Sequence, residues 1–398
     1  MGGTAAFIQQ AHAGVAGRPF GVLGPLGAPV RVVHDAVSST TYRLVSRALA
    51  AGPAALARVT PGNGIPLADT LRGSIALGAL NGAIGDRLAR GGSPLALDMT
   101  LREDDETTVT PRIAVFVHGL CETDDAWNIR QPSYGARLRK ELGYTPLYVR
   151  YNSGLHISDN GRRLAELLED AVASWPVPVE EIALVGHSMG GLVARSACHY
   201  GGDWAQSVRH VFCLGSPHLG APLEKGANAL GHALARLPET RPVAELVNGR
   251  SVGIKDLRFG SCAEEDWCDC DPDEFLRDRC TEVPFLDCAT YYFVGATLSR
   301  RRDSIVGDLL VRFPSASGDG KRRRLPFEVD HGMHLPGANH FQLLNHPAVY
   351  EQLVSWLAAG RASGGQSSPT PLQPQLPGGP GDPCRPSSRA ADGPAPLR

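Results

Sequence analysis

The stretch 181–200 reads EIALVGHSMGGLVARSACHY and decides the fold of this chain. Its first six residues form an apolar run that predicts a buried strand, and the pattern in 189–200 predicts a helix. The turn between them carries a G-x-S-x-G pattern, which is typical of a serine held on a sharp strand-to-helix turn. Such a turn needs small residues at Gly186 and Gly190, on either side of Ser188. The alternative is a tight glycine turn with an inert surface serine, and the flanking strand and helix favour the first interpretation.

Apolar runs and helical patterns alternate on both sides of this stretch. The runs that predict strands are 112–118, 145–151, 208–215, 291–298 and, as a further candidate, 325–330. The patterns that predict helices are 134–143, 158–175 with a cap at Ser158 or Asp159, and 347–359. Such alternation indicates an α/β protein with a mostly parallel sheet and helices on both faces.

The rest of the chain predicts three additions to this sheet. Residues 1–110 carry apolar residues at helical spacing, which indicates a helical N-terminal extension. Residues 216–288 interrupt the alternation, and we interpret them as an inserted cap. Residues 361–398 are rich in Pro, Gly and Ser, which predicts a disordered tail. The predicted α/β domain therefore spans 111–360.

The composition of the 398 residues is that of a globular protein with little net charge. Hydrophobic residues make up 42%, charged residues 20%, and the formal net charge is −2. This charge gives no reason to expect nucleic acid as a partner. The sequence shows no secretory signal and no uncharged apolar run of the roughly 20 residues that span a bilayer. We therefore expect a cytoplasmic or peripherally membrane-associated protein, and the sequence leaves its oligomeric state open.

A second motif lies where the strand predicted at 112–118 ends. The strand runs directly into His118, Gly119 and Leu120. The tetrahedral intermediate of acyl transfer carries an oxyanion, which needs two preorganised hydrogen-bond donors. The N–H of Leu120 and the N–H of Met189, next to the serine, are the candidates. The alternative is an ordinary turn that ends a strand.

A serine hydroxyl is a poor nucleophile without a base, which this architecture supplies from a loop late in the chain. His340 lies in such a loop, just before the closing helix, and is the predicted base. His346 precedes Pro347 and is interpreted as part of the start of that helix. His331 and His334 follow the candidate strand and are interpreted as loop histidines.

The third member of such a site is a carboxylate that orients the imidazole. Asp303 and Asp308 both follow the strand predicted at 291–298. Asp308 lies in a glycine turn before an apolar stretch, which would fix its direction. Asp303 lies among arginines, where a solvated ion pair explains it. We therefore predict Asp308. The resulting chain order Ser, Asp, His is the order that this architecture uses.

Five cysteines crowd into the predicted cap. Their spacing matches no standard structural zinc site, so we predict no metal. A disulfide-stapled cap and a mobile cap with unpaired thiols remain as alternatives. The cysteines are Cys262, Cys268, Cys270, Cys280 and Cys288.

Two basic runs, 300–302 and 321–324, flank Asp308 in the sequence. A solvated loop face is one interpretation. The other is attraction to an anionic membrane surface, to which each charge contributes about 1 kcal/mol. The sequence leaves both open.

Five stretches together resemble a known superfamily. They are HGLCETDDAWN, GHSMGG, LGSPHLGAPLEK, GDLLV and GANHF, which begin at residues 118, 186, 214, 307 and 337. They look like bacterial lipases and esterases of the α/β-hydrolase superfamily, and resemble most the branch that includes GPI inositol deacylases. The resemblance covers about 111–358. It implies a hydrolase of lipid or other carboxylic esters that needs no cofactor and no metal.

The predicted function is therefore carboxylic ester hydrolysis through an acyl-enzyme. Ser188, His340 and Asp308 form the predicted catalytic set, and Leu120 and Met189 the predicted oxyanion hole. An acyltransferase that uses the same serine and a catalytically silent binding protein of the same fold are the alternatives. A peptidase or thioesterase would use the same residues.

Overall fold

The computed structural model describes residues 69–103, 109–129, 131–235 and 241–364. The predicted helices before residue 69 and most of the predicted tail lie outside these residues.

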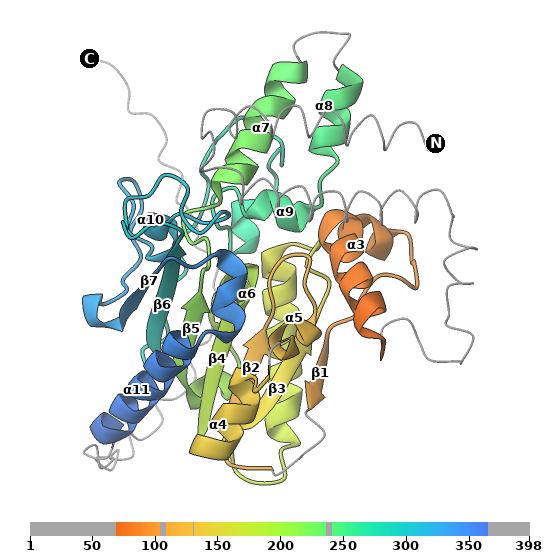
Figure 1. Ribbon diagram of the computed structural model, residues 1–398. Helices are drawn as coiled ribbons and strands as arrows, with labels where there is room; N and C mark the ends of the chain where they lie inside the picture. Colours follow the sequence, from red (N-terminus) through yellow and green to blue (C-terminus); the bar gives the residue numbers. More distant parts are fainter. Residues whose placement is uncertain (1–68, 104–108, 130, 236–240, 365–398) are drawn as a thin grey trace, which may run out of the picture.

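The described residues form seven strands and a series of helices around them (Figure 1). The strands are β1 (Thr100–Glu103), β2 (Arg112–Val117), β3 (Thr145–Arg150), β4 (Glu181–His187), β5 (Val208–Leu214), β6 (Thr290–Thr297) and β7 (Gly332–Pro336). The α-helices are α3 (Leu71–Arg90), α4 (Tyr134–Leu142), α5 (Ile157–Ala173), α6 (Met189–Tyr200), α7 (Pro222–Ala235), α8 (Arg241–Asn248), α9 (Val252–Asp256), α10 (Phe313–Ala316) and α11 (Pro347–Gly364). Short 3-10 helices are η3 (Asp124–Asn128), η4 (Asp203–Ser207), η6 (Glu264–Asp266), η7 (Val329–His331) and η8 (His340–Asn345).

All seven strands belong to one sheet in the order β1-β3-β2-β4-β5-β6-β7. β1 pairs antiparallel with β3, and every other neighbouring pair is parallel. The carboxyl ends of β2, β4, β5, β6 and β7 therefore meet at one edge of the sheet. In open α/β sheets, ligands bind outside this edge.

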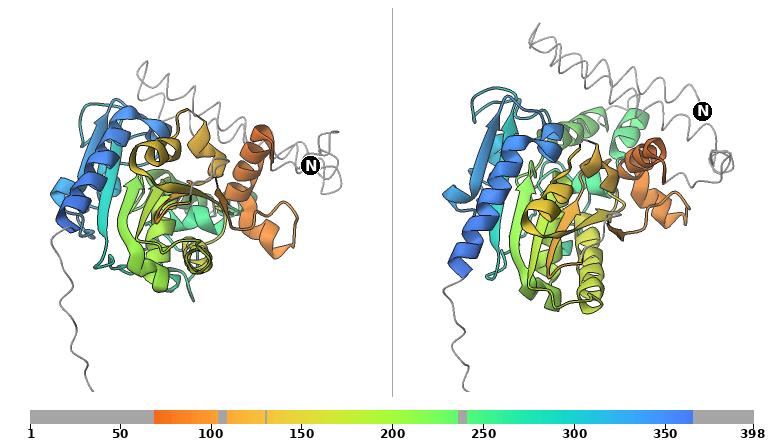
Figure 2. Two further views of the ribbon diagram at one scale, coloured as in Figure 1. Left: turned by 90° about the horizontal axis from the view of Figure 1, so that it is seen from below. Right: turned by 60° about the horizontal axis from the view of Figure 1, so that its bottom comes forward.

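Two hydrophobic cores cover the two faces of the sheet. On one face, alternate strand residues such as Ile113 and Val115 pack with α5 and α6. On the other face, Ala114 and Phe116 of the same strand pack with α4 and α11. Figure 2 shows α11 (blue) and α5 (yellow-green) on opposite sides of the sheet. This confirms the predicted mostly parallel sheet with helices on both faces.

Three local predictions differ from the structure. The candidate strand at 325–330 is not a strand, because Pro326 has no N–H to donate to a ladder, and the last strand is β7 instead. The N-cap of α5 is His156, and the first helical N–H, of Ile157, donates to Asp256 at 2.8 Å rather than to a local side chain. Within the predicted helical extension, α3 is a helix, but 100–103 form β1 at the edge of the sheet.

The segment between β5 and β6 contains α7, α8 and α9, and α7 and α8 project beyond one end of the sheet (Figure 1). A buried carboxylate organises it, since Glu224 pairs with Arg250 at 2.7 Å and with Arg258 at 3.1 Å. The cysteines of this segment are free thiols in the described chain. Among the described residues, no helix combines the length and the apolar character that a bilayer span requires.

Candidate active site

Ser188 occupies the turn between β4 and α6, at the carboxyl edge of the sheet. Its backbone has φ 54° and ψ −122°, a conformation that is costly for a residue with a Cβ. Its N–H donates to the carbonyl of Leu214 on β5 at 2.8 Å. A Cβ at Gly190 would overlap the carbonyl oxygen of Val117, and one at Gly186 would overlap the backbone of α6. The structure therefore has the sharp turn that the sequence predicts, and we call residues 186–190 the elbow.

The structure brings His340 and Asp308 together. His340 Nδ1 and Asp308 Oδ2 are 2.7 Å apart, and both side chains are buried. The His340 N–H also donates to the Asp308 carbonyl at 3.1 Å. His340 Nε2 is buried and has no hydrogen-bond partner among the described residues. This nitrogen is therefore free to bind a proton from another group.

Asp308 is fixed by its own turn. Its Oδ1 accepts hydrogen bonds from the N–H groups of Leu310 at 3.0 Å and Val311 at 2.7 Å. Its other oxygen is thereby directed at His340. Asp303, in contrast, is exposed and pairs with Arg301 at 2.6 Å.

The other late histidines have separate structural partners. His334 lies on β7, with Nε2 2.7 Å from Thr297 Oγ1. His346 Nδ1 accepts from the N–H of Ala348 at 3.2 Å, which helps to begin α11. His331 is in η7, 3.7 Å from Glu328. His340 is therefore the late histidine that meets Asp308.

Ser188 and His340 meet at the end of β5. The Ser188 N–H bonds to Leu214, and a Cβ on the next residue, Gly215, would lie 3.1 Å from His340 Cε1. The elbow also contacts His340 directly, because His187 Nε2 is 3.2 Å from the His340 carbonyl oxygen. The predicted nucleophile and the predicted base thus belong to one cluster.

Residues 118–123 follow β2, and we call them the β2 loop. A Cβ at Gly119 would lie only 3.0 Å from Ser188 Cβ, so the loop passes directly beside the elbow. Leu120 is the next residue of the loop. Met189 is the first residue of α6, and the first N–H groups of a helix have no partner within the helix. Both predicted donors thus lie in segments next to Ser188.

Contacts of His118 hold the first residues of the β2 loop in place. Its ring stacks on Tyr151, with 4.2 Å between the ring centroids. Its Nε2 accepts from the Tyr151 N–H at 3.3 Å, so Nδ1 carries the proton and donates to the carbonyl oxygen of Gly119 at 2.9 Å. Burial lowers the pKa of His118, which agrees with this neutral form.

Helix α3 holds the outer side of the same loop. Ser74 and Thr123 share a hydrogen bond of 2.6 Å between their hydroxyls. A Cβ at Gly78 would lie 2.8 Å from the carbonyl oxygen of Glu122, and one at Gly82 would overlap Cys121 Sγ. Small residues on α3 therefore let the helix lie directly on the loop.

Glu122 and His187 are two site residues that the sequence analysis did not single out. Glu122 Oε2 accepts from the Gly119 N–H at 2.7 Å and lies 3.0 Å from His187 Nδ1. The contact between Glu122 and His187 has no periodic signature, since Glu122 follows β2 and His187 ends β4. The position of Glu122 within HGLCE is the signal that the sequence offers.

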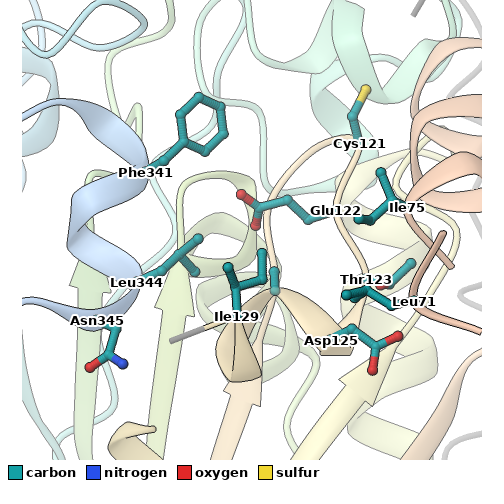
Figure 3. Close-up of a pocket in the computed structure, with 11 residues that line it drawn as sticks. Leu71, Ile75, Cys121, Glu122, Thr123, Asp125, Ile129, Phe341, Leu344 and Asn345 are labelled. Carbon is teal, nitrogen blue, oxygen red and sulfur yellow. The ribbon is translucent and has the colours of Figure 1, made fainter. Parts of the chain in front are cut away.

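An apolar pocket of about 330 Å³ opens beside this cluster. Phe341 and Leu344 of η8 form one side, and Leu71 and Ile75 of α3 form the other, with Glu122 between them (Figure 3). The remaining lining residues are Cys121, Thr123, Asp125, Ala126, Ile129 and Asn345. The pocket is connected to the cluster through two of its lining residues, since Phe341 follows His340 in the sequence and Glu122 contacts Gly119.

Large exposed apolar side chains surround its entrance. Leu71, Ile75, Ile129 and Phe341 are all exposed. A concentration of exposed apolar groups at a pocket is typical of a site that binds an apolar ligand or surface.

The surroundings of His340 set its proton affinity. Burial opposes protonation, but the charge and the hydrogen bond of Asp308 outweigh burial and raise the pKa of His340 above its usual value of 6.5. A base with this shift accepts a proton readily near neutral pH.

The two basic runs are partly engaged within the protein. Arg301 pairs with Asp303, and Arg324 pairs with Asp319 at 2.9 Å. Arg323 is directed inward, to the carbonyl oxygens of His218 and Phe259. These contacts reduce the charge that either run presents to a surface.

One protein-family model matches part of the chain. Residues 136–271 match the family model of the PGAP1-like alpha/beta domain, a match that contains the elbow but not the β2 loop, Asp308 or His340. No curated protein matches the sequence.

Several solved structures are similar. The lipase BlEst2 of Bacillus licheniformis in its mature form is 19% identical, with a TM-score of 0.43 over 65% of this chain and 98% of that chain. A putative lipase of Acinetobacter baumannii AYE is 16% identical, with a TM-score of 0.38 over 67% of this chain and 89% of that chain. A lipase-esterase related protein of Clostridium acetobutylicum ATCC 824 is 16% identical, with a TM-score of 0.34 over 65% and 98%. By its sheet order and elbow the chain has the α/β-hydrolase fold, and over 136–271 it is similar to the PGAP1-like alpha/beta domain.

Proposed function

We propose that this protein is a serine hydrolase that cleaves carboxylic esters of apolar acyl chains. The observation that carries the proposal is the pairing of His340 with Asp308 beside the elbow. Among the residues that the structure describes, His340 Nε2 is buried with no hydrogen-bond partner, and the elbow that holds Ser188 on a strained turn contacts His340 through His187.

In the proposed reaction, His340 Nε2 takes the hydroxyl proton of Ser188 as the serine oxygen attacks the ester carbonyl. The N–H groups of Leu120 and Met189 donate to the oxyanion of the tetrahedral intermediate. The intermediate collapses, and the alcohol leaves with the proton from His340. Water then attacks the acyl-enzyme and gives its proton to His340, which passes it to the Ser188 oxygen as the free acid is released. Asp308 stabilises the charged imidazole in both halves.

The pocket supports an apolar acyl group as the substrate. It lies beside the β2 loop, with Glu122 in its lining, and η8 and α3 line it with side chains of Phe, Leu and Ile. Its volume of about 330 Å³ is at the lower end of the range of small-molecule sites. We therefore expect a chain of intermediate length to bind better than acetate. The exposed apolar rim supports contact with a lipid surface, which would deliver such a substrate.

The test is hydrolysis of p-nitrophenyl esters from acetate to palmitate by the wild type and by Ser188→Ala. Removal of the nucleophile should lower kcat by roughly 10⁶-fold, as in other serine hydrolases. A fluorophosphonate probe should label the wild type and not the variant. Equal turnover by both proteins would refute Ser188 as the nucleophile. Acyl transfer to an added alcohol in preference to water would identify an acyltransferase, and a protein that neither turns over nor labels would be a binding protein.

A further inference from the structure

We propose that Glu122 is a positioning residue that joins the three segments of the site through His187, and that the two residues form a buried ion pair. The expected effect on the rate of ester hydrolysis rests on the proposed function. The contact between Glu122 and His187 does not depend on that function.

One carboxylate oxygen connects the β2 loop to the elbow. Glu122 Oε2 accepts from the Gly119 N–H at 2.7 Å and lies 3.0 Å from His187 Nδ1. Gly119 directly precedes Leu120, a proposed oxyanion donor, and His187 directly precedes Ser188. Glu122 therefore fixes the residue before a proposed donor relative to the residue before the proposed nucleophile.

The same chain of hydrogen bonds continues to the proposed base. His187 Nε2 is 3.2 Å from the carbonyl oxygen of His340. A carbonyl can only accept, so Nε2 must carry a proton. The Glu122 oxygen on the other side already accepts from Gly119. The ring satisfies both neighbours when both of its nitrogens are protonated and Glu122 is ionised.

The surroundings fit a charged pair. The His187 side chain is fully buried and that of Glu122 is 11% exposed, so each charge needs the other. Burial raises the pKa of Glu122, but the charge of His187 and the hydrogen bonds from His187 and Gly119 outweigh burial and lower it below its usual value. A neutral ring would satisfy either the carbonyl or the carboxylate, and would leave the other contact unmade.

The remaining charged groups around the pair come from three elements. His118 begins the β2 loop and acts on Glu122, and Asp124 follows the loop and acts on His118. His340 faces His187, with 4.8 Å between ring centroids, and Asp308 lies behind His340. Because His118 is neutral, Glu122 with His187 and Asp308 with His340 are the two carboxylate–imidazole pairs of the cluster.

The experiment compares Glu122→Gln with Glu181→Gln. Glu181 is a matched control, since it lies at the opposite end of β4 and is also a buried carboxylate near a histidine, 3.5 Å from His210. Gln keeps the shape of each side chain and removes its charge. In Glu122→Gln we expect kcat for a p-nitrophenyl ester to fall by about 10- to 100-fold with little change in KM. A displaced oxyanion donor costs up to about 10³-fold. Glu181→Gln should retain the wild-type kcat.

Nuclear magnetic resonance gives a readout that does not depend on turnover. At pH 7 both ring nitrogens of His187 should carry protons in the wild type and one in Glu122→Gln, with the signals assigned by comparison with His187→Gln. The Gly119 amide proton should move upfield in Glu122→Gln, because it loses a charged acceptor, and should stay in place in Glu181→Gln.

Two results would overturn the proposal. One is a singly protonated His187 ring in the wild type, and the other is a kcat of Glu122→Gln within twofold of the wild type. Failure of the proposed function looks different. In that case Ser188→Ala retains the wild-type turnover, whereas the resonances of His187 and Gly119 still report whether the ion pair exists.

Discussion

The elbow and the β2 loop lie on either side of Ser188 but are built in different ways. The elbow is determined within five residues, because its glycines avoid overlap with β2 and with α6. The β2 loop is held by groups far away in the sequence, namely Ser74 and Gly82 of α3, Tyr151 after β3, and His187 of the elbow. One half of the site is therefore local, and the other half depends on the whole fold.

This difference indicates which substitutions should disturb the geometry of the site. The elbow should lose its geometry only when its own residues change. The β2 loop should also be displaced by substitutions in α3 or after β3, at residues that do not contact a substrate. The predictions that follow test each half, from the largest expected effect to the smallest.

Of the substitutions that follow, Asp308→Asn should lower turnover the most. The amide would favour the wrong tautomer of His340, and such a change lowers kcat by about 10⁴-fold in a serine protease. Asp303→Asn is the control, because Asp303 is exposed and pairs with Arg301. Steady-state hydrolysis of a p-nitrophenyl ester measures both. Comparable losses in the two variants would contradict the assignment of Asp308.

Gly82→Ala should damage the β2 loop from outside the site. The new methyl group would overlap Cys121 Sγ and displace the loop. We expect a loss of about 10²-fold in kcat, as for an oxyanion donor out of place, and about 1–3 kcal/mol in the free energy of unfolding.

Gly226→Ala is the matched control for this substitution. Gly226 lies in α7, and a Cβ there meets no atom within 4 Å. Alanine is preferred over glycine inside a helix by about 0.5–1 kcal/mol, so this variant should be slightly more stable and fully active. Chemical denaturation and ester hydrolysis would measure both proteins. A fully active Gly82→Ala would show that α3 does not hold the loop.

Ile75→Trp should change the chain-length preference by about tenfold. The larger side chain would fill the α3 side of the pocket, and one methylene of fit in an apolar pocket is worth about 10- to 200-fold in specificity. The ratio of kcat/KM for octanoate to that for acetate should fall, with acetate hydrolysis unchanged. Leu223→Trp, at an exposed position away from the pocket, should keep the wild-type ratio. An unchanged ratio in Ile75→Trp would mean that the acyl chain binds elsewhere.

The pH dependence should show the smallest effect. Only the neutral form of His340 can accept the serine proton, so activity should rise as pH increases through the pKa of His340. Because the pKa of His340 is raised, the midpoint of this rise should lie above 6.5. A pH profile of kcat/KM measures it, and the midpoint should fall in Asp308→Asn. A wild-type midpoint well below 6.5 would be inconsistent with the Asp308 contact.

The contrast between the two halves also explains what the sequence could predict. The strand and helix periods around 181–200 predicted the sheet correctly. The turn at Asp308 and the late loop at His340 predicted two residues that the structure brings together. Glu122 and His187 are 65 residues apart in the sequence, and Ser74 and Thr123, which join α3 to the β2 loop, are 49 residues apart. The close packing of α3 on the loop also depends on glycines of the helix. No periodic pattern encodes such contacts. The antiparallel strand β1 was missed for another reason: it is only four residues long, which is too short to show a period.

The strained backbone of Ser188 has a consequence for the evolution of this protein. A residue with a Cβ at φ 54° and ψ −122° costs about 1–3 kcal/mol, which the surrounding fold must supply. Glycine adopts this conformation freely, so Ser188→Gly should unfold at a higher temperature than both the wild type and Ser188→Ala. Selection for stability alone would therefore replace this serine by glycine. A descendant chain in which the proposed activity is no longer selected would drift towards a more stable molecule without the nucleophile.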